Sequence, residues 1–590
     1  MEFSEMLNWI LGGGLLAAVV GLLTLKATVR KANAEAEKAK AEAETVRIGN
    51  TEQATRILIE NIVEPLKKEL SETREDLREA KKELGSTKRE MARFRKAIET
   101  ANSCKFRADC PVIFKLRDLT RGSAGKGADG GDGATGQPRA RSSPDTWGSV
   151  MTLQEVPTDL WAANWFYKAH TDFMWKATDY FVCEIFEFFV PAITKATALI
   201  ARIQDAPVSD DIKNRYIAEL RVVRALWMYD LFDLYGPVPA ITDPEKILNP
   251  TQDFTVTRPS REEYITFVET ELKEVINAKI LPVAWTGSDY GHVSQATAMM
   301  VLLQLYMHEG GYCRNKHVGD YLDYFKKAEQ VAKDIMDLQY YELQAEFKDI
   351  WSPQNQHNNE IIFALPSFPI PVMGNNFLAH VLPTDYKSQQ GIPLTGWNGF
   401  RTPWEVYDSF DPADKRRQVH KTEYWNGKEM VTGRTGTLEY GALPMKYQEN
   451  ANTDGTNDAS EYVIYRYADV IMLRAEAKNE IFGPDGGGTP TAKELLHQVC
   501  RRSFDNYDQT DHKKKIDQIT DIDAFRAHLL QERAWEFIWE GKRRSDMIRH
   551  GVFISNAISR GKNLAKDYHE LYPIPQQTIY ELKIKQNDGY

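Results

Sequence analysis

ERAWEFIWEGKRRSDMIRHG, residues 532–551, sets two tryptophans in a dense run of opposite charges. Trp535, Ile538 and Trp539 recur at helical spacing, so this stretch is predicted to form a helix with an apolar face. Ion pairs packed beside indoles usually lock a fold together, whereas catalysis requires a pair with perturbed pKa values in a cleft. We favour the structural interpretation.

A change of direction is predicted within the same stretch. Gly541 interrupts the helical pattern and indicates a bend between a buried helix and a basic turn. If the helix instead continues, Glu540 reaches Arg543 or Arg544, which lie three and four residues further along the chain.

The composition is that of an acidic, aromatic-rich protein, long enough for several domains or one large helical domain. Of its 590 residues, 42% are hydrophobic and 11% aromatic, with 13 tryptophans and 26 tyrosines. The net charge of -10 argues against a nucleic-acid partner, which needs a basic surface to neutralise phosphates. Five cysteines are too few and too scattered for a disulfide framework, and only Cys104 and Cys110 lie close together.

Residues 1–30 are predicted to anchor the chain in a membrane. Residues 7–25 are almost wholly apolar, and as a helix they span about 28 Å, close to the thickness of a bilayer core. Glu2 and Glu5 precede them and basic residues follow, the reverse of a secretory signal peptide. The positive-inside rule then places the following residues in the cytoplasm. An apolar helix of a soluble protein is the alternative, which the glycines at 12–14 disfavour.

Residues 31–118 are predicted to form a coiled coil through which the chain associates with itself. Mostly apolar residues repeat at two heptad positions among charged ones: Ile59, Leu66, Thr73, Ala80, Thr87 and Phe94, and Val63, Leu70, Leu77, Leu84, Met91 and Ile98. A single solvated helix is the alternative, which the two threonines favour. Residues 119–146 are glycine-rich and predict a flexible linker, so a domain boundary is expected there.

From residue 147 onward, the periodicity predicts helices joined by irregular loops. The predicted helices cover residues 216–234, 262–280, 294–308, 324–336 and 465–481. Helix pairs at intervals suggest stacking of the tetratricopeptide kind. Residues 350–460 have little helical pattern and a strand-like segment at 360–365. Such an insertion on a rigid scaffold is where binding surfaces usually lie.

Eight segments in order resemble those of the SusD/RagB family of surface glycan-binding lipoproteins. They are residues 221–239 (RVVRALWMYDLFDLYGPVP), 258–272 (RPSREEYITFVETEL), 291–306 (GHVSQATAMMVLLQLY), 359–363 (NEIIF), 408–416 (DSFDPADKR), 465–477 (YRYADVIMLRAEA), the opening stretch 532–551 and 572–579 (YPIPQQTI). One departure is His292, where the family usually has arginine. The resemblance covers residues 147–590.

The resemblance implies a mostly α fold with tetratricopeptide-like helix pairs and a large loop insertion. It also implies non-enzymatic capture of a glycan or oligosaccharide at the outer membrane, and hand-over by a lid-like closure to a SusC-like, TonB-dependent transporter. Family members begin with an acylated cysteine, but here no cysteine precedes Cys104. The N-terminal part is therefore interpreted as an unrelated membrane-anchor and coiled-coil module, whose anchor is oriented as in an inner-membrane protein.

Two aromatic clusters are candidates for glycan binding, because sugars need aromatic platforms for their C–H faces and amides or carboxylates for their hydroxyls. The first cluster contains Trp161, Asn164 and Trp165. The second contains Tyr386, Trp397, Asn398 and Trp404, and the Trp397 loop is preferred. Core packing explains any single tryptophan more often than ligand contact does. Lesser candidates are Trp285, Tyr290 and Trp425.

One stretch approaches the spacing of a calcium-binding loop, through Asn450, Asn452, Asp454 and Glu461. Its first position is asparagine and no helix precedes it, so a polar turn that caps a helix starting near Glu461 is the favoured alternative. Histidine metal ligands and a Ser-His-Asp set have no recognisable spacing. The carboxylate pairs of glycosidases are set by distance in space, so the sequence neither supports nor excludes them.

Three functions remain open, in order of preference. The first is a non-enzymatic glycan-binding protein that delivers its ligand to a transporter. The second is a membrane-tethered scaffold whose coiled coil and helical repeats hold a protein partner. The third is a helical glycan hydrolase or lyase. Under the first, residues 532–551 belong to the scaffold, and four of their charged side chains pin the last helices onto the body: Arg533, Glu540, Arg543 and Asp546.

Overall fold

The computed structural model describes residues 143–590, apart from 164–166, 249–255 and 369–373. The predicted membrane anchor at 1–30, the coiled coil at 31–118 and nearly all of the linker at 119–146 lie outside the described residues. Of the helices within the described ranges, none combines the length and the apolar character that a membrane span requires.

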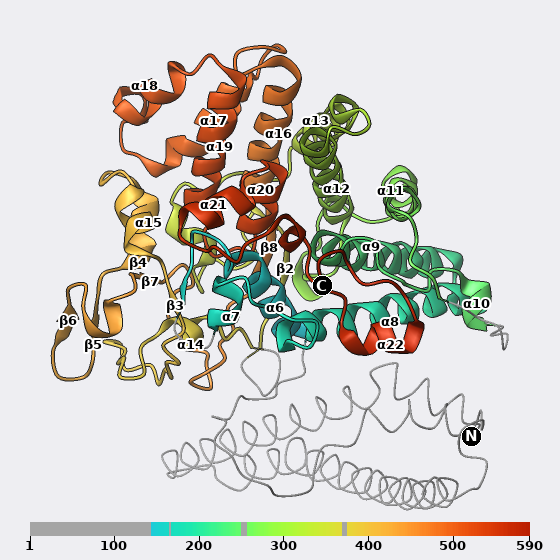
Figure 1. Ribbon diagram of the computed structural model, residues 1–590, viewed down its shortest axis with the longest axis horizontal. Helices are drawn as coiled ribbons and strands as arrows, with labels where there is room; N and C mark the ends of the chain where they lie inside the picture. Colours follow the sequence, from blue (N-terminus) through green and yellow to red (C-terminus); the bar gives the residue numbers. More distant parts are fainter. Residues whose placement is uncertain (1–142, 164–166, 249–255, 369–373) are drawn as a thin grey trace, which may run out of the picture. The chain divides into compact units, whose positions relative to one another are not determined.

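The described part is mostly helical (Figure 1). The long helices are α8 (Tyr180–Ile203), α9 (Asp210–Tyr235), α11 (Arg261–Ala278), α12 (Gln295–Lys316), α13 (Tyr321–Asp337), α16 (Tyr467–Phe482) and α19 (Ile522–Phe537). The shorter α-helices are α6 (Ser143–Glu155), α7 (Lys168–Thr171), α10 (Pro244–Leu248), α14 (Phe377–Val381), α15 (Trp404–Ser409), α17 (Ala492–Cys500), α18 (Asp511–Asp517), α20 (Arg543–Arg549), α21 (Phe553–Ser559) and α22 (Gln576–Leu582).

Single turns of 3-10 helix and short strands join these helices. The 3-10 turns are η3 (Gly287–Asp289), η4 (Phe347–Trp351), η5 (Lys415–Val419), η6 (Gly436–Leu438), η7 (Arg501–Ser503), η8 (Tyr507–Gln509) and η9 (Asp567–Glu570). The strands form antiparallel pairs: β1 (Ala162–Ala163) with β3 (Phe400–Arg401), β2 (Ile361–Leu365) with β8 (Tyr462–Arg466), β4 (His420–Lys421) with β7 (Leu443–Pro444), and β5 (Glu423–Trp425) with β6 (Met430–Thr432).

Helices that follow one another along the chain pack side by side. α8 packs on α9, α9 on α11, α11 on α12 and α12 on α13; α13 then packs on α16, and α16 on both α17 and α19. Figure 1 shows α12, α13, α16 and α17 standing next to one another. The five helices predicted from periodicity are confirmed as α9, α11, α12, α13 and α16.

The ends of α9 follow the sequence, but its buried face is shifted. The helix ends at Gly236, whose φ of 73° is in the left-handed region that glycine adopts without strain. In the middle of the helix, Val222 and Ala225 are fully buried, whereas Val223 and Trp227 of the predicted stripe are only half-buried. The predicted stripe is therefore about one position away from the face that packs most deeply.

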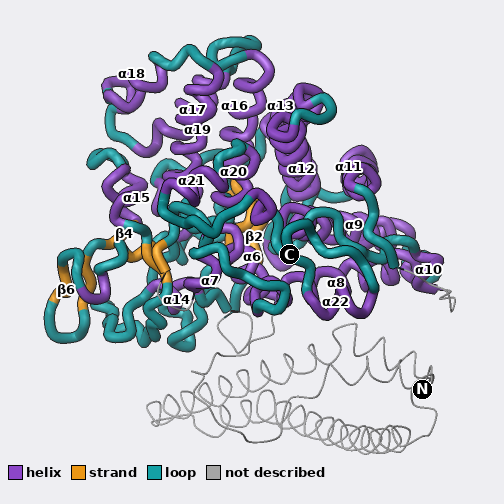
Figure 2. The backbone as a smooth tube through the Cα atoms, in the orientation of Figure 1, coloured by secondary structure: helices purple, strands orange, loops and turns teal. Residues whose placement is uncertain are grey.

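The insertion predicted at residues 350–460 is largely loop, as Figure 2 shows around α14, β4 and β6. The strand predicted at 360–365 is confirmed as β2, and it pairs with β8. The helix predicted to start near Glu461 is wrong at that point, because residues 462–466 extend as β8 and α16 begins only at Tyr467. The pairing with β2 holds this segment extended in spite of its helical pattern.

Two hydrophobic cores meet at residues 532–551. The larger core fills the helical array and includes Phe537 and Met547. The smaller core lies under the insertion and includes Ala534, Ile538 and Trp539. The stretch therefore contributes side chains to both cores within a few residues.

The prediction of a helix with Trp535, Ile538 and Trp539 on one apolar face is wrong. α19 ends at Phe537, and Trp539 has a φ of 65°, so the chain turns before Gly541 and again at it. Trp539 is buried while Trp535 is only half-buried. The buried face of α19 instead carries charge, on Glu532, Arg533 and Glu536.

These buried charges pair with residues far away in the sequence. Glu540 reaches Arg466 and Lys446, so the predicted contacts with Arg543 and Arg544 do not form. The pinning function predicted for four residues is confirmed. Arg533 joins Asp469 and Asp546 at 2.8 and 2.9 Å, and Arg543 joins Asp159 at 2.7 Å. The pairs link α19 and α20 to α16, to β8 and to the segment after α6.

A buried carboxyl group caps the turn after α19. Oε1 of Glu155 accepts hydrogen bonds from the backbone N–H groups of Gly541 and Lys542 at 2.8 and 3.2 Å. Burial is the largest influence on this group and raises its pKa from 4.5 to about 8. The folded protein thus keeps a proton on Glu155 at pH values where the unfolded chain has lost it.

Glu155→Gln is expected to make the protein more stable than the wild type at pH 8. Glu155 makes its full contribution to the free energy of unfolding below pH 4.5. This contribution decreases as the pH rises toward 8, because only the unfolded chain releases the proton in that window. A shift of this size is worth up to about 5 kcal/mol, and we expect a gain above about 1 kcal/mol at pH 8 that shrinks toward pH 5. Urea unfolding at both pH values measures it. The exposed Glu262→Gln serves as the control, and a gain independent of pH contradicts the prediction.

Candidate functional site

The loop that carries Trp397 is fixed to α14 and to the chain just after it. The backbone N–H groups of Trp397, Asn398 and Gly399 donate to carbonyl oxygens there at 2.6, 2.9 and 2.7 Å. Gly396 permits this close approach, since a Cβ at that position would lie 2.1 Å from the carbonyl oxygen of Pro383. The half-buried Trp397 ring therefore sits on a backbone that is held in place before any ligand binds.

A continuous set of rings connects Trp397 with the core. Its ring meets His380 edge-on with centroids 4.7 Å apart, and His380 stacks on Phe400 at 4.5 Å. Phe400 in turn contacts Trp161 at 4.2 Å and stacks on Trp539 at 5.3 Å. We call these five rings the aromatic stack. It supports the Trp397 loop on the stretch at 532–551.

Of the first predicted glycan cluster, only Trp161 lies within the described residues. Trp161 is 5% exposed and packs within the aromatic stack, so in the folded protein its ring is a core group. Asn164 and Trp165 lie outside the described residues.

The other predicted glycan residues are half-buried and already have partners. The amide oxygen of Asn398 accepts a hydrogen bond from the buried Arg401. The indole N–H of Trp404 donates to the backbone of Leu438 at 2.9 Å. Tyr386 donates to Glu449, which also accepts from Ser388 at 2.6 Å. Packing against the smaller core brings Tyr386 and Trp404 close to the structure that supports Trp397.

One face of Trp404 is covered by a cation. The guanidinium group of Arg434 lies 4.2 Å from its ring centroid and pairs with Asp408 at 2.6 Å. A sugar could stack on that face only by displacing Arg434. Trp397 has no such cation among the contacts of the described residues, which makes it the better platform.

A hollow of about 260 Å³ lies beside β2, lined by two of the lesser candidates, Trp285 and Tyr290. Arg215 lies 4.2 Å above the Trp285 ring, and Tyr290 stacks on His357 with centroids 3.6 Å apart. Asn358 and Asn359 also line this hollow. Trp425, the third lesser candidate, is half-buried on β5.

The carboxylates of the calcium-like loop bind protein groups. Oδ1 of Asp454 accepts from the backbone N–H groups of Thr456 and Asn457 at 2.9 and 2.8 Å. The two oxygens of Glu461 accept from the Tyr290 hydroxyl at 2.5 Å and from the backbone of His357 at 2.8 Å. Asn450 donates to Ser460 at 3.2 Å, and its Oδ1 accepts from the backbone of Asn452 at 2.9 Å. In the structure these oxygens stabilise a turn and its neighbours, and calcium binding by this loop stays a prediction.

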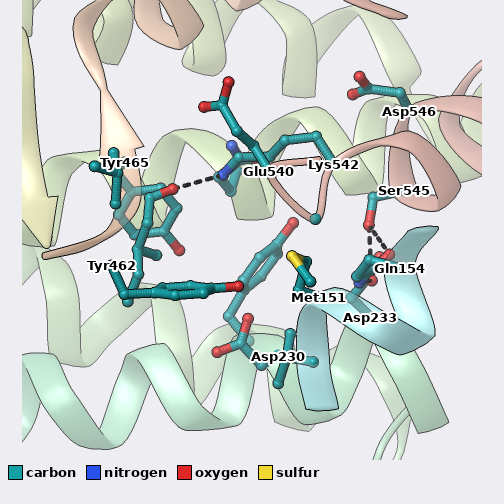
Figure 3. A pocket seen from close by; sticks show the side chains of 16 residues that line it. Met151, Gln154, Asp230, Asp233, Tyr462, Tyr465, Glu540, Lys542, Ser545 and Asp546 are labelled. Carbon is teal, nitrogen blue, oxygen red and sulfur yellow. Dashed lines mark hydrogen bonds between the residues drawn. The ribbon is translucent and has the colours of Figure 1, made fainter. Parts of the chain in front are cut away.

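Figure 3 shows a small polar cavity where α6, α9, β8 and the turn at 540–546 meet. Its volume is about 50 Å³, which suits water-sized molecules and not a sugar. Oδ2 of Asp230 makes no hydrogen bond within the part of the chain that the structure describes. Burial and the neighbouring Asp233 raise the pKa of Asp230 well above its ordinary value. Sequence reasoning missed this cavity, because its walls come from five separate segments, including Gln304 of α12.

Comparisons with known proteins agree with this architecture. Residues 418–590 match the model of the SusD family. The starch-binding protein SusD of Bacteroides thetaiotaomicron is 22% identical over 535 residues, covering 79% of this chain and 89% of that protein.

Solved structures also resemble the described part. A SusD superfamily protein from Parabacteroides distasonis superposes with a TM-score of 0.62 at 20% identity, covering 75% of this chain and 93% of the other. Surface glycan-binding protein A from Bacteroides thetaiotaomicron, in complex with laminarihexaose, gives 0.57 at 18% identity, with coverages of 74% and 93%.

The protein is thus mostly helical, with the SusD-like fold. Together with the sequence match at 418–590, this fold supports the SusD/RagB resemblance of the body.

Proposed function

We propose that residues 147–590 form a SusD/RagB domain that binds glycans or oligosaccharides at the cell surface without transforming them. The observation that carries this proposal is the half-buried Trp397 ring on a fixed loop, supported by the aromatic stack. A rigid aromatic ring offers a C–H face of a sugar a contact that costs little conformational entropy. Relatives named for starch binding and solved with laminarihexaose support glucans as the first ligands to try.

Delivery of the bound glycan to a SusC-like, TonB-dependent transporter of the outer membrane is part of the same proposal. It rests on the family resemblance, as do the surface location and the lid-like closure. Membrane attachment and self-association through residues 1–118 are proposed from the sequence alone.

Trp397→Ala is expected to weaken glycan binding by about 10-fold or more, because a stacking aromatic is typically worth 1–3 kcal/mol. Isothermal titration of the full chain with laminarihexaose and with soluble starch measures the loss. Thermal unfolding should change little, since the ring is half-buried and its loop is held by backbone hydrogen bonds. Lost stability with unchanged binding would make Trp397 a packing residue.

Variants of other tryptophans show whether the Trp397 loop or the hollow beside β2 binds the glycan. Trp535→Ala, another half-buried ring, is expected to leave binding unchanged. If Trp285→Ala abolishes binding and Trp397→Ala does not, the hollow beside β2 is the site. A folded chain that binds no member of a broad glycan panel would favour the protein-binding scaffold, and release of reducing ends would favour the hydrolase or lyase.

A further inference from the structure

Three side chains with metal-binding chemistry, those of Cys500, His512 and Glu532, converge between the last helices of the array, and His528 lies beside Glu532. Cys500 is the final residue of α17, and His512 lies in the first turn of α18. His528 and Glu532 lie four residues apart on α19, which places both on one face of that helix. Cys500, His512 and Glu532 are buried, and the His528 side chain is 21% exposed.

The ligand atoms of this cluster are close together. Sγ of Cys500, one ring nitrogen of His512 and one carboxylate oxygen of Glu532 lie within 4.8 Å of one another. Nε2 of His512 is 2.8 Å from Oε1 of Glu532, and Nε2 of His528 is 3.5 Å from the same oxygen. Sγ of Cys500 is 3.4 Å from Oε2. Tetrahedral bonds to zinc of 2.0–2.3 Å place such atoms about 3.3–3.7 Å apart, so small side-chain rotations suffice to close on an ion.

Three of these atoms make no hydrogen bond within the described residues. They are Nε2 of His512, Nε2 of His528 and Oε1 of Glu532. The close approach of His512 and Glu532 thus brings two polar atoms together without the alignment of a hydrogen bond. A buried polar atom left without a partner is costly, and a cation bound by His512 and Glu532 would satisfy the atoms of both.

The charges around the cluster are compatible with a divalent ion. Arg416 lies 3.1 Å from the other oxygen of Glu532, but it is also paired with Asp414 at 2.7 Å. A thiolate and a carboxylate balance a divalent ion, and His512 would bind it in its neutral form. Arg416 with Asp414 is then a second neutral pair. Arg416 holds the Glu532 carboxylate in position through its second oxygen, as groups around metal ligands commonly do.

We propose that Cys500, His512 and Glu532 bind one zinc ion that ties α17, α18 and α19 together. Sulfur, nitrogen and oxygen ligands from three different helices are a mixed set that zinc accepts in proteins. The ion would hold the end of the helical array. The three ligands come from three different helices, so no spacing in the sequence marks them as a set.

The purified full chain, with Cys104 and Cys110 replaced by serine, tests the proposal. That background removes the two cysteines that lie outside the described residues. Zinc titration against a chromophoric chelator is expected to give about one equivalent bound per chain. Cys500→Ser and His512→Gln are expected to weaken binding by about 10-fold or more. Cys313→Ser, which alters another buried cysteine on α12, serves as the control and should retain full affinity.

Cobalt substitution provides a second measurement, and its spectrum in the background chain reports the ligand set without any change to the proposed ligands. In the background chain, cobalt should give a thiolate charge-transfer band and the intense visible bands of a tetrahedral site. The thiolate band should persist in Cys313→Ser and vanish in Cys500→Ser. A chain that binds no zinc, or binds it equally well in all variants, overturns the proposal. A cobalt spectrum of octahedral, thiolate-free coordination overturns it as well.

Discussion

Glu536→Gln is expected to lower the free energy of unfolding by about 3–5 kcal/mol, the usual cost of removing one partner from a buried ion pair. The Glu536 side chain has 0% exposure and lies 2.7 Å from Arg466, 2.5 Å from Arg502 and 3.5 Å from Arg416. Glutamine keeps the shape but removes the charge. The buried guanidinium groups of Arg466, Arg502 and Arg416 would then have one carboxylate fewer to pair with. Water cannot reach them to replace the lost interaction.

Urea unfolding monitored by tryptophan fluorescence measures this loss. Asp523→Asn, on the exposed start of the same helix and paired with Arg526, is the control and should cost under about 1 kcal/mol. The arginines hold the pKa of Glu536 far below its ordinary value of 4.5. Its contribution is therefore present above pH 4.5 and is lost as the pH falls below that value, so the difference between wild type and variant should shrink in acid. A difference under 1 kcal/mol at pH 7 would contradict the prediction.

Trp539→Ala is expected to cost about 3–5 kcal/mol of stability and also to weaken glycan binding. Trp539 is 2% exposed, stacks on Phe400 and donates its indole N–H to Thr402 at 3.0 Å. Its removal leaves a cavity under the aromatic stack and takes from the Thr402 hydroxyl one of its two hydrogen-bond partners, leaving His420 at 3.0 Å. The loop at 396–399 would lose the support that fixes the Trp397 ring.

The two effects of Trp539→Ala are separated by measuring both at a temperature where the variant remains folded. Thermal unfolding reports the stability, and titration with the glycan that the wild type binds reports the site. Trp535→Ala, at a half-buried position on the preceding helix α19, should cost about 1 kcal/mol and leave binding intact. Binding equal to wild type in folded Trp539→Ala would show that the aromatic stack does not support the site.

Periodicity was enough to place the regular helices, because their apolar spacing and end signals are local. Ser260 and Ser294 cap α11 and α12 through capping boxes, and Gly236 ends α9. The same local rules failed at residues 532–551. There the apolar spacing of Trp535 and Trp539 continues past Phe537, but long-range contacts with Lys446 and Arg466 draw the chain out of the helix.

The candidate site was less predictable, because exposure is decided by contacts that no sequence pattern contains. Trp161 and Trp397 look alike in the sequence, yet the first is buried against Phe400 and the second is half-buried on a loop. The cation over Trp404 comes from Arg434, in a different segment of the insertion. Which of these rings meets a glycan remains a prediction.

The position of the junction between the two cores has a consequence for biosynthesis. Residues 532–551 supply side chains to both cores and ion partners to β8, α16 and the segment after α6, yet they leave the ribosome after all three of these segments. Until they emerge, Arg466 and Asp469 lack carboxylate or guanidinium partners from this stretch, and neither core is complete. The nascent helical body therefore reaches its native state only after residues 532–551 have been synthesised, and a chain truncated before residue 532 would be a substrate for chaperones and proteases.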